Sequence, residues 1–168
     1  MEERNFERVE QLIKFILEKC GGMSYWIDWG GGGLYIDTHF DIERIFYTIY
    51  LSDKNFNFKI KELYISNLEI DEIPDGWLEK LDTLKKLTCR NNNLRKLPKL
   101  PKNLKHLDCS DNQLIELPEL PKFLDFLCCE NNQLNELPKL PEYLSQLECE
   151  DNPGYNDWLK NPILKKLI

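Results

Sequence analysis

Residues 84–152 read LKKLTCRNNNLRKLPKLPKN (84–103), LKHLDCSDNQLIELPELPKF (104–123), LDFLCCENNQLNELPKLPEY (124–143) and LSQLECEDN (144–152). Two residue types recur every 20 positions through this stretch: the cysteines Cys89, Cys109, Cys129 and Cys149, and the asparagines Asn92, Asn112, Asn132 and Asn152. A fixed period of this length predicts a solenoid, in which each unit buries its apolar side only by stacking on its neighbours.

The segment HLDCS (106–110) indicates what each repeat position does. Leu107 and Cys109 are two residues apart, so in a strand both point to one face, whereas His106, Asp108 and Ser110 point to the other. Parallel strands stack about 4.8 Å apart, so equivalent residues of successive units form ladders. Cysteine suits the inner ladder because it is small and leaves no strong polar group unsatisfied.

The recurring asparagines have a different cause. A turn after each strand leaves backbone N–H and C=O groups facing inward, and an amide side chain can both donate to and accept from them. The LPxLP segments that follow suit an extended outer wall, because proline fixes φ and lacks an N–H. Their PxxP spacing is also that of ligands for aromatic grooves. Its recurrence with Leu97 and Leu100 in every unit favours core-facing leucine and structural proline.

The first unit is longer and degenerate. Ile60, Leu63 and Ile65 occupy the positions that Leu84, Leu87 and Cys89 occupy in the next unit, and the extra length at 74–80 allows a short helical turn. The solenoid is therefore expected to span 58–152. Residues 153–168 are expected to form a C-terminal cap, in which Trp158 and Leu159 cover the last exposed layer of the solenoid. Leu164 and Leu167 follow Leu144 and Leu147 by one full repeat period, which predicts the beginning of one more strand.

Residues 1–57 are expected to form an N-terminal α+β cap. A helix is predicted over 3–19, from apolar residues at helical spacing. A β-hairpin is predicted from 24–28 and 34–38, joined by the glycines 30–33. Residues 42–51 fit both a helix and a strand; their β-branched and aromatic composition favours the strand.

The frame LxxLxCxxNxLxxLPxLPxx resembles leucine-rich repeats, in particular the short 20-residue class familiar from secreted effectors of pathogenic bacteria. The cysteine-bearing form also resembles repeats of some bacteria, amoebae and giant DNA viruses. The match covers roughly residues 58–152. The resemblance implies an α/β solenoid, curved, with a concave parallel sheet, extended convex LPxLP segments and a role in protein interaction. It names no partner, because a fold does not give a function.

Composition narrows the functional classes. The formal net charge is −7, which argues against nucleic-acid and membrane-surface binding because both need a basic face. The start MEERNFERVE lacks the order of a signal peptide, and no apolar run is long enough to cross a bilayer. Four of the six cysteines share one repeat position, so we expect reduced, buried thiols and an intracellular, cytoplasmic location, in a host cell if the protein is an effector.

Metal and catalytic chemistry are not expected. A straight ladder with rungs about 4.8 Å apart cannot converge on one zinc ion. Cys128 is predicted to lie exposed on the outward face, where neighbouring acids raise its pKa and oppose a role as nucleophile. His39 and His106 stand alone. We therefore predict no cofactor, no metal and no enzymatic activity.

Function is expected on the concave face, whose outward residues the repeat leaves free to vary. Its early part is mixed in charge and its later part is acidic, which predicts a protein partner with a basic patch. The predicted partner-binding residues are Tyr64, Lys86, Arg90, His106, Asp108, Phe126, Cys128, Glu130, Glu148 and Glu150. Alternatively, residues 1–57 are the functional part and the repeats are a scaffold.

Overall fold

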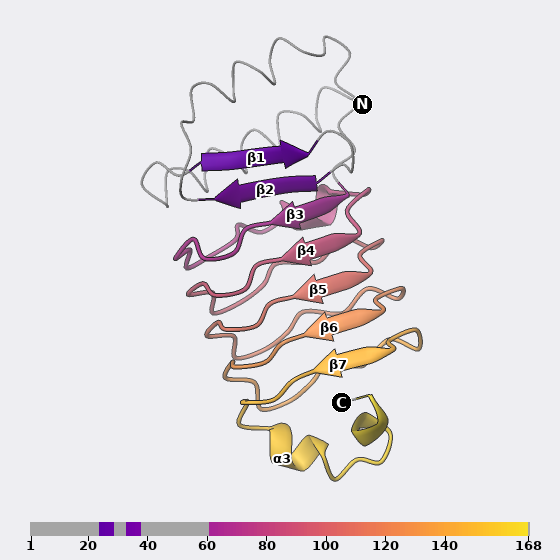
Figure 1. Cartoon of the computed structure of the whole chain (residues 1–168). Coiled ribbons are helices and arrows are strands. Elements are labelled where there is room, and N and C mark those ends of the chain that lie inside the picture. Colours follow the sequence, from indigo (N-terminus) through magenta and orange to yellow (C-terminus); the bar gives the residue numbers. More distant parts are fainter. Residues whose placement is uncertain (1–23, 29–32, 38–60, 168) are drawn as a thin grey trace, which may run out of the picture.

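The computed structural model describes residues 24–28, 33–37 and 61–167. Its framework is a seven-stranded sheet in which the strands follow one another in chain order (Figure 1). The strands are β1 (Ser24–Asp28), β2 (Gly33–Asp37), β3 (Glu62–Tyr64), β4 (Lys86–Thr88), β5 (His106–Asp108), β6 (Phe126–Cys128) and β7 (Gln146–Glu148). Strands β3 to β7 are parallel and each belongs to one repeat, so the structure is a solenoid with a parallel sheet, as the sequence predicts.

The register of the parallel strands follows the repeat. Leu63 pairs with Leu87 across the longer first unit, and Leu87, Leu107, Leu127 and Leu147 then pair from one regular unit to the next. The predicted hairpin is confirmed as β1 and β2, which pair antiparallel. Strand β2 then pairs with β3 in parallel, so the hairpin extends the sheet of the solenoid. The predicted helix over 3–19 and strand over 42–51 lie outside the described residues.

The core is a stack of leucine and cysteine side chains behind the strands. The middle leucine of each strand, Leu63 to Leu147, is at most 1% exposed. Cys89, Cys109, Cys129 and Cys149 are fully buried beside them as free thiols, as the repeat predicts. The 3-10 turn η1 (Leu78–Lys80) fills the extra length of the first unit and buries Leu78.

The asparagine ladder satisfies the buried backbone groups at the turn after each strand. Asn112 accepts a hydrogen bond from the Leu94 N–H at 3.0 Å. Its amide nitrogen donates to the carbonyl oxygens of Cys89, Cys109 and Ser110 at 2.9–3.2 Å. Asn92, Asn132 and Asn152 make the same kind of contacts in the other units. The predicted dual role of this amide is confirmed.

The residue that precedes each ladder asparagine adopts the left-handed conformation. In the first unit Leu68 stands at the asparagine position, and Asn67 precedes it. The φ of the preceding residue lies between 48° and 60° at Asn67, Asn91, Asp111, Asn131 and Asp151. Asn and Asp tolerate this region better than other residues with a Cβ, which explains why these two types alone occupy the position.

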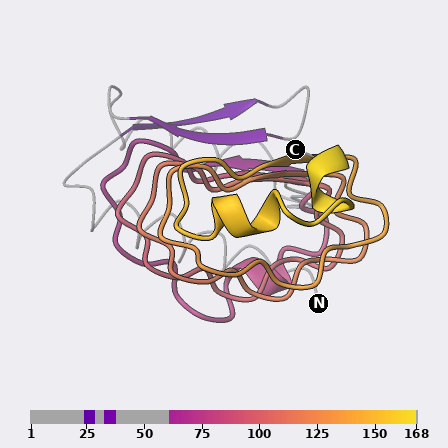
Figure 2. The same cartoon turned by 90° about the horizontal axis from the view of Figure 1, so that it is seen from below.

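The C-terminal cap closes the last layer. Helix α3 (Tyr155–Trp158) crosses the open end of the stack and buries Trp158 against the core (Figure 2). The prediction of one more strand was wrong: Leu164–Lys166 is a 3-10 turn, η2, which follows a turn closed by the Asn161 side chain on the Ile163 N–H. The carbonyl oxygen of Leu167 still accepts from the Leu147 N–H at 3.0 Å, so the segment satisfies part of the edge of β7.

None of the helices within the described residues has the length and apolar character that a membrane crossing requires.

Candidate functional site

The outward side chains of β3 to β7 form one continuous surface, the sheet face. It consists of the first and third residue of each strand and the second residue after it. These are Glu62, Tyr64, Ser66, Lys86, Thr88, Arg90, His106, Asp108, Ser110, Phe126, Cys128, Glu130, Gln146, Glu148 and Glu150. The strand register places them in three columns across the sheet, so all ten predicted partner-binding residues lie on this face.

The N-terminal part of the sheet face joins a cation to an aromatic ring. The Lys86 ammonium on β4 lies 5.2 Å from the centroid of the Tyr64 ring on β3. The Tyr64 hydroxyl donates to a Glu62 carboxylate oxygen at 2.7 Å. The distance between the ammonium and the ring suits a cation–π contact. The cation, the ring and the carboxylate are thus linked on two neighbouring strands.

Two stacked rings occupy the middle of the face. The imidazole of His106 on β5 and the ring of Phe126 on β6 are nearly parallel, 6° apart, with centroids separated by 4.1 Å. Burial and the nearby Lys86 lower the pKa of His106, which favours the neutral form of its imidazole. Phe126 is half-buried, and part of its ring is open to a partner.

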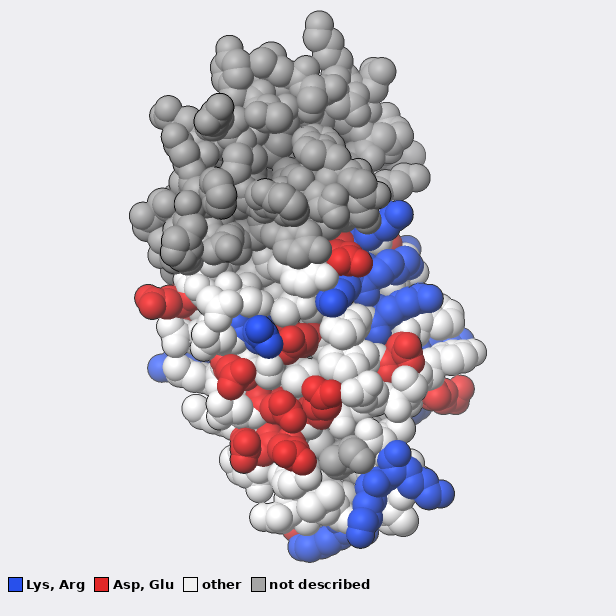
Figure 3. Space-filling view, viewed as in Figure 1, with Lys and Arg blue, Asp and Glu red and all other residues white. Residues whose placement is uncertain are grey.

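The C-terminal part of the face is acidic. Carboxylates from Asp108, Glu130, Glu148 and Glu150 gather over β5 to β7, with Asp111 and Asp151 in the adjoining turns (Figure 3). Burial and its neighbours Glu148, Glu150, Asp111 and Asp151 raise the pKa of Glu130. The ion pairs found within the described residues involve Lys96, Lys102 and Lys160 with other acids. Among the described residues, therefore, no ion pair neutralises these carboxylates.

Cys128 lies on the outward side of β6 but is only 5% exposed, so the prediction of an exposed cysteine was wrong. The neighbouring Asp108, Ser110, Glu130 and Glu148 surround the thiol. Burial is the largest cause that raises the pKa of the Cys128 thiol, to about 12. A hydrogen bond with the Glu130 backbone lowers this pKa, and the Asp108 carboxylate raises it. The predicted direction is confirmed, although the main cause is burial. A protonated, buried thiol is a poor nucleophile at neutral pH.

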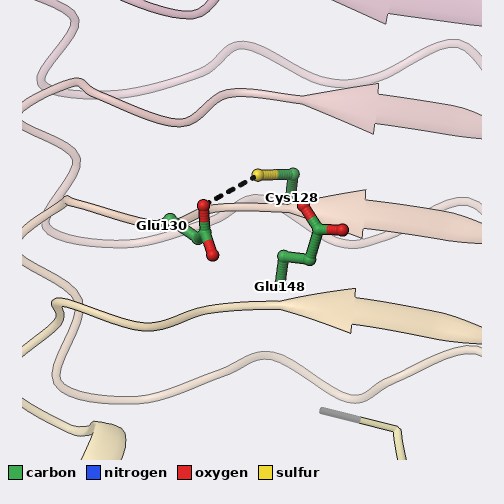
Figure 4. A group of neighbouring side chains, drawn as sticks. All are labelled: Cys128, Glu130 and Glu148. Atoms are coloured by element: carbon green, nitrogen blue, oxygen red, sulfur yellow. Dashed lines mark hydrogen bonds between the residues drawn. The ribbon is translucent and has the colours of Figure 1, made fainter.

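Cys128, Glu130 and Glu148 are the group within the described residues that could hold a metal ion (Figure 4). Their sulfur and carboxylate oxygens lie within 4.8 Å of one another, and the thiol contacts a Glu130 oxygen at 3.9 Å. Zinc ligands sit about 2.0–2.3 Å from the ion. The side chains would have to draw together, and Cys128 would have to lose its proton despite its raised pKa. The sequence predicted no such group.

The structure also exposes an apolar ridge that the sequence reasoning missed. Phe123 and Tyr143 occupy the same position of consecutive units, just before the leucine that precedes each strand, and are 48% and 57% exposed. Their rings contact each other with centroids 5.6 Å apart. Ile163, at the equivalent position one period later, is 71% exposed. The signal was the regular spacing of three large apolar residues at a variable repeat position.

Comparison with known proteins agrees with this architecture. A family model described as Leucine Rich Repeat matches residues 103–124. The structure of YopM from Yersinia enterocolitica WA-314 has 36% sequence identity and a TM-score of 0.51, over 55% of this chain and 20% of that chain. A Shigella effector LRR domain has 35% identity and a TM-score of 0.52, over 55% of this chain and 40% of that chain. Among curated proteins no match was found.

This chain therefore spans a fifth and two fifths of the length of these two solved chains. The chain is thus similar to leucine-rich-repeat proteins, bacterial effector repeats among them, and shares their solenoid architecture.

Proposed function

We propose that this protein is a non-enzymatic interaction module that binds a protein partner through the sheet face, with a basic patch of the partner on the acidic C-terminal half. Leucine-rich repeats commonly serve as protein-interaction modules, which supports the general class. The repeat fixes the inner side of every strand and leaves the sheet face free to vary. The residues of the sheet face can therefore change to fit a particular partner without disturbing the core.

The observation that carries the proposal is the acidic group of the sheet face, for which no ion pair is found among the residues that the structure describes. Six carboxylates, on Asp108, Asp111, Glu130, Glu148, Glu150 and Asp151, gather at one end of the face. Such a group repels itself and lowers stability, so it is expected where a partner supplies the compensating charge. The field also steers a basic partner toward this end, more strongly at low salt.

The same proposal places the protein inside a cell. The five described cysteines are free and buried, which suits a reducing compartment. The solved structures that resemble the chain include a Shigella effector domain. We extend that role to this chain as a proposal: the protein acts in the cytoplasm, of a host cell if it is delivered as an effector.

Charge reversal on the sheet face tests the proposal. A partner is captured from lysate with the wild-type protein, identified by mass spectrometry and purified, and its Kd is measured. The double variant D108K/E130K should lose binding by at least about tenfold, because two favourable charge pairs become repulsive. A partner that binds D108K/E130K as tightly as wild type contradicts a site on this face.

The matched control is E116K/E136K, which makes the same charge change at two exposed glutamates of the connecting segments. It should keep the affinity within about twofold once ionic strength is physiological, because distant exposed charges are screened. Equal loss in both double variants would indicate a dependence on net charge alone and would contradict a defined site. Thermal melting of both variants confirms that each remains folded.

A further inference from the structure

The sheet face already contains one arrangement of a cation, an aromatic ring and a carboxylate. Lys86 lies over the Tyr64 ring at 5.2 Å, and Tyr64 donates to Glu62 at 2.7 Å. All three side chains are half-buried, so the charges interact in surroundings less polar than bulk water. The protein thus supplies its own example of how a cation sits on this face.

Three strands further along, from β3 to β6, a ring and carboxylates recur without the cation. Phe126 presents a half-buried ring, backed by the parallel imidazole of His106. Glu148 lies one strand on, paired in register with Cys128, and Glu130 lies two residues after Cys128. In the described structure the sheet-face positions of β6 and β7 hold no Lys or Arg; they hold Phe126, Cys128, Glu130, Gln146, Glu148 and Glu150.

The distances fit one long basic side chain. Cys128 is next but one to Phe126 along the strand and Glu148 is the diagonal neighbour of Phe126, and such positions are about 7–8 Å apart, which a long side chain spans. Glu130 is two residues further on, but its carboxylate turns back to within 3.9 Å of the Cys128 sulfur. The carboxylates of Glu130 and Glu148 lie close enough for both to be within 4.8 Å of the Cys128 sulfur. One cation can therefore contact both carboxylates at once, and each adds to its binding.

We infer that this part of the sheet face binds an arginine side chain of the partner, with the guanidinium stacked on Phe126 and donating to Glu148 and Glu130. The inference rests on the proposed function and names the group that the partner contributes. Arginine fits better than lysine because its planar guanidinium is weakly hydrated, stacks on aromatic rings and donates through a fork that matches carboxylates. Charge alone does not distinguish the two residues, whereas the Phe126 ring does.

The experiment measures binding of hexa-arginine, hexa-lysine and hexa-citrulline peptides to the full chain by calorimetry at low ionic strength with a chelator present. We expect hexa-arginine to bind more tightly than hexa-lysine, and hexa-citrulline not to bind. The variant Phe126→Leu should weaken hexa-arginine about two- to fivefold, the size of one exposed cation–π contact, and should reduce the preference over hexa-lysine. Phe126→Tyr should retain both.

The matched control is Phe123→Leu, which removes an exposed aromatic ring outside the sheet face and should leave the preference unchanged. The variant E130Q/E148Q should weaken both basic peptides and flatten the dependence of Kd on salt. Melting curves confirm that the variants are folded, since Phe126→Leu also removes the stack with His106.

The inference is overturned if Phe126→Leu changes the arginine preference no more than Phe123→Leu does. It is also overturned if zinc ions, added without the chelator, bind wild type but not Cys128→Ser and displace hexa-arginine, because the acidic group would then be a metal site. Its failure is separable from failure of the proposed function: D108K/E130K would still lose the captured partner while the arginine preference was independent of Phe126.

Discussion

The two sides of the five parallel strands differ in how their polar groups are partnered. On the inner side, Asn112 alone satisfies four buried backbone groups, and its equivalents repeat this in other units. On the outer side, burial and four neighbouring acids raise the pKa of Glu130. The inner side is arranged for stability. The outer side carries acids for which no ion pair is found among the described residues, and their mutual repulsion opposes stability. That contrast is what makes the outer side a candidate for binding.

The largest effect should come from breaking the inner ladder. Asn112→Leu leaves the Leu94 N–H and the carbonyl oxygens of Cys89, Cys109 and Ser110 without their partner. Each unsatisfied buried group costs about 1–3 kcal/mol, so we expect the free energy of unfolding to fall by about 3 kcal/mol or more. Urea denaturation measures it.

The control is Asn135→Leu, the same substitution at an exposed position, which should change stability by about 0.5 kcal/mol or less. If the two variants melted alike, the ladder would not be the source of stability that its hydrogen bonds indicate.

The next effect concerns the buried and exposed sides of the C-terminal cap. A methyl group at Gly154 would overlap the carbonyl oxygen of Asn135 and lie 2.6–2.7 Å from two atoms of the Trp158 ring. Overpacking of this kind costs about 1–3 kcal/mol, so Gly154→Ala should destabilise by that amount. Asn156→Ala, on the exposed side of α3, should be close to neutral. Differential scanning calorimetry distinguishes them, and equal melting temperatures would mean that α3 does not seal the core.

The inner side was predictable from the sequence because one repeated set of contacts determines it. Leu107, Cys109 and Asn112 each meet the same neighbours as their equivalents in the adjoining units, so the period alone fixes register, burial and hydrogen bonding. The outer side and the ends were harder. The burial of Cys128 depends on Asp108, Ser110, Glu130 and Glu148, a combination that occurs once.

The C-terminal segment shows why spacing misleads once the repeat has ended. Leu164 and Leu167 keep the spacing of the repeat, yet no LPxLP segment precedes them to carry the chain along the outer wall. The helix α3 replaces that segment, and the chain re-enters as the 3-10 turn η2. Spacing predicted that these leucines contact the core, which they do as partly buried residues, but not the backbone conformation.

A pair of cysteines compares the two sides with one substitution. Cys89→Ser places a hydroxyl in a fully buried position on the inner ladder, which should cost about 1 kcal/mol or more. Cys128→Ser places the same hydroxyl beside the Glu130 carboxylate, which can accept its hydrogen bond, so the change should be about 0.5 kcal/mol or less. Chemical denaturation of both variants in a reducing buffer measures the difference. Costs in the reverse order would mean that Cys128 belongs to the core.

The smallest effect has the opposite sign. The pKa of Glu130 is raised in the folded protein, so ionised Glu130 opposes folding above that pKa, and the penalty disappears as pH falls through the raised pKa to the unfolded value near 4.5. Glu130→Gln should therefore stabilise the protein at pH 7, by less than about 1 kcal/mol because the side chain is largely solvated. The gain should vanish near pH 4. Urea denaturation from pH 4 to 8 tests this against Glu119→Gln, an exposed glutamate of the outer wall that should show no such pH-dependent gain. If Glu130→Gln destabilised the protein at pH 7, the Glu130 carboxylate would be stabilising the fold. The contrast between a stabilising inner side and an outer side destabilised by its own charge would then not hold at Glu130.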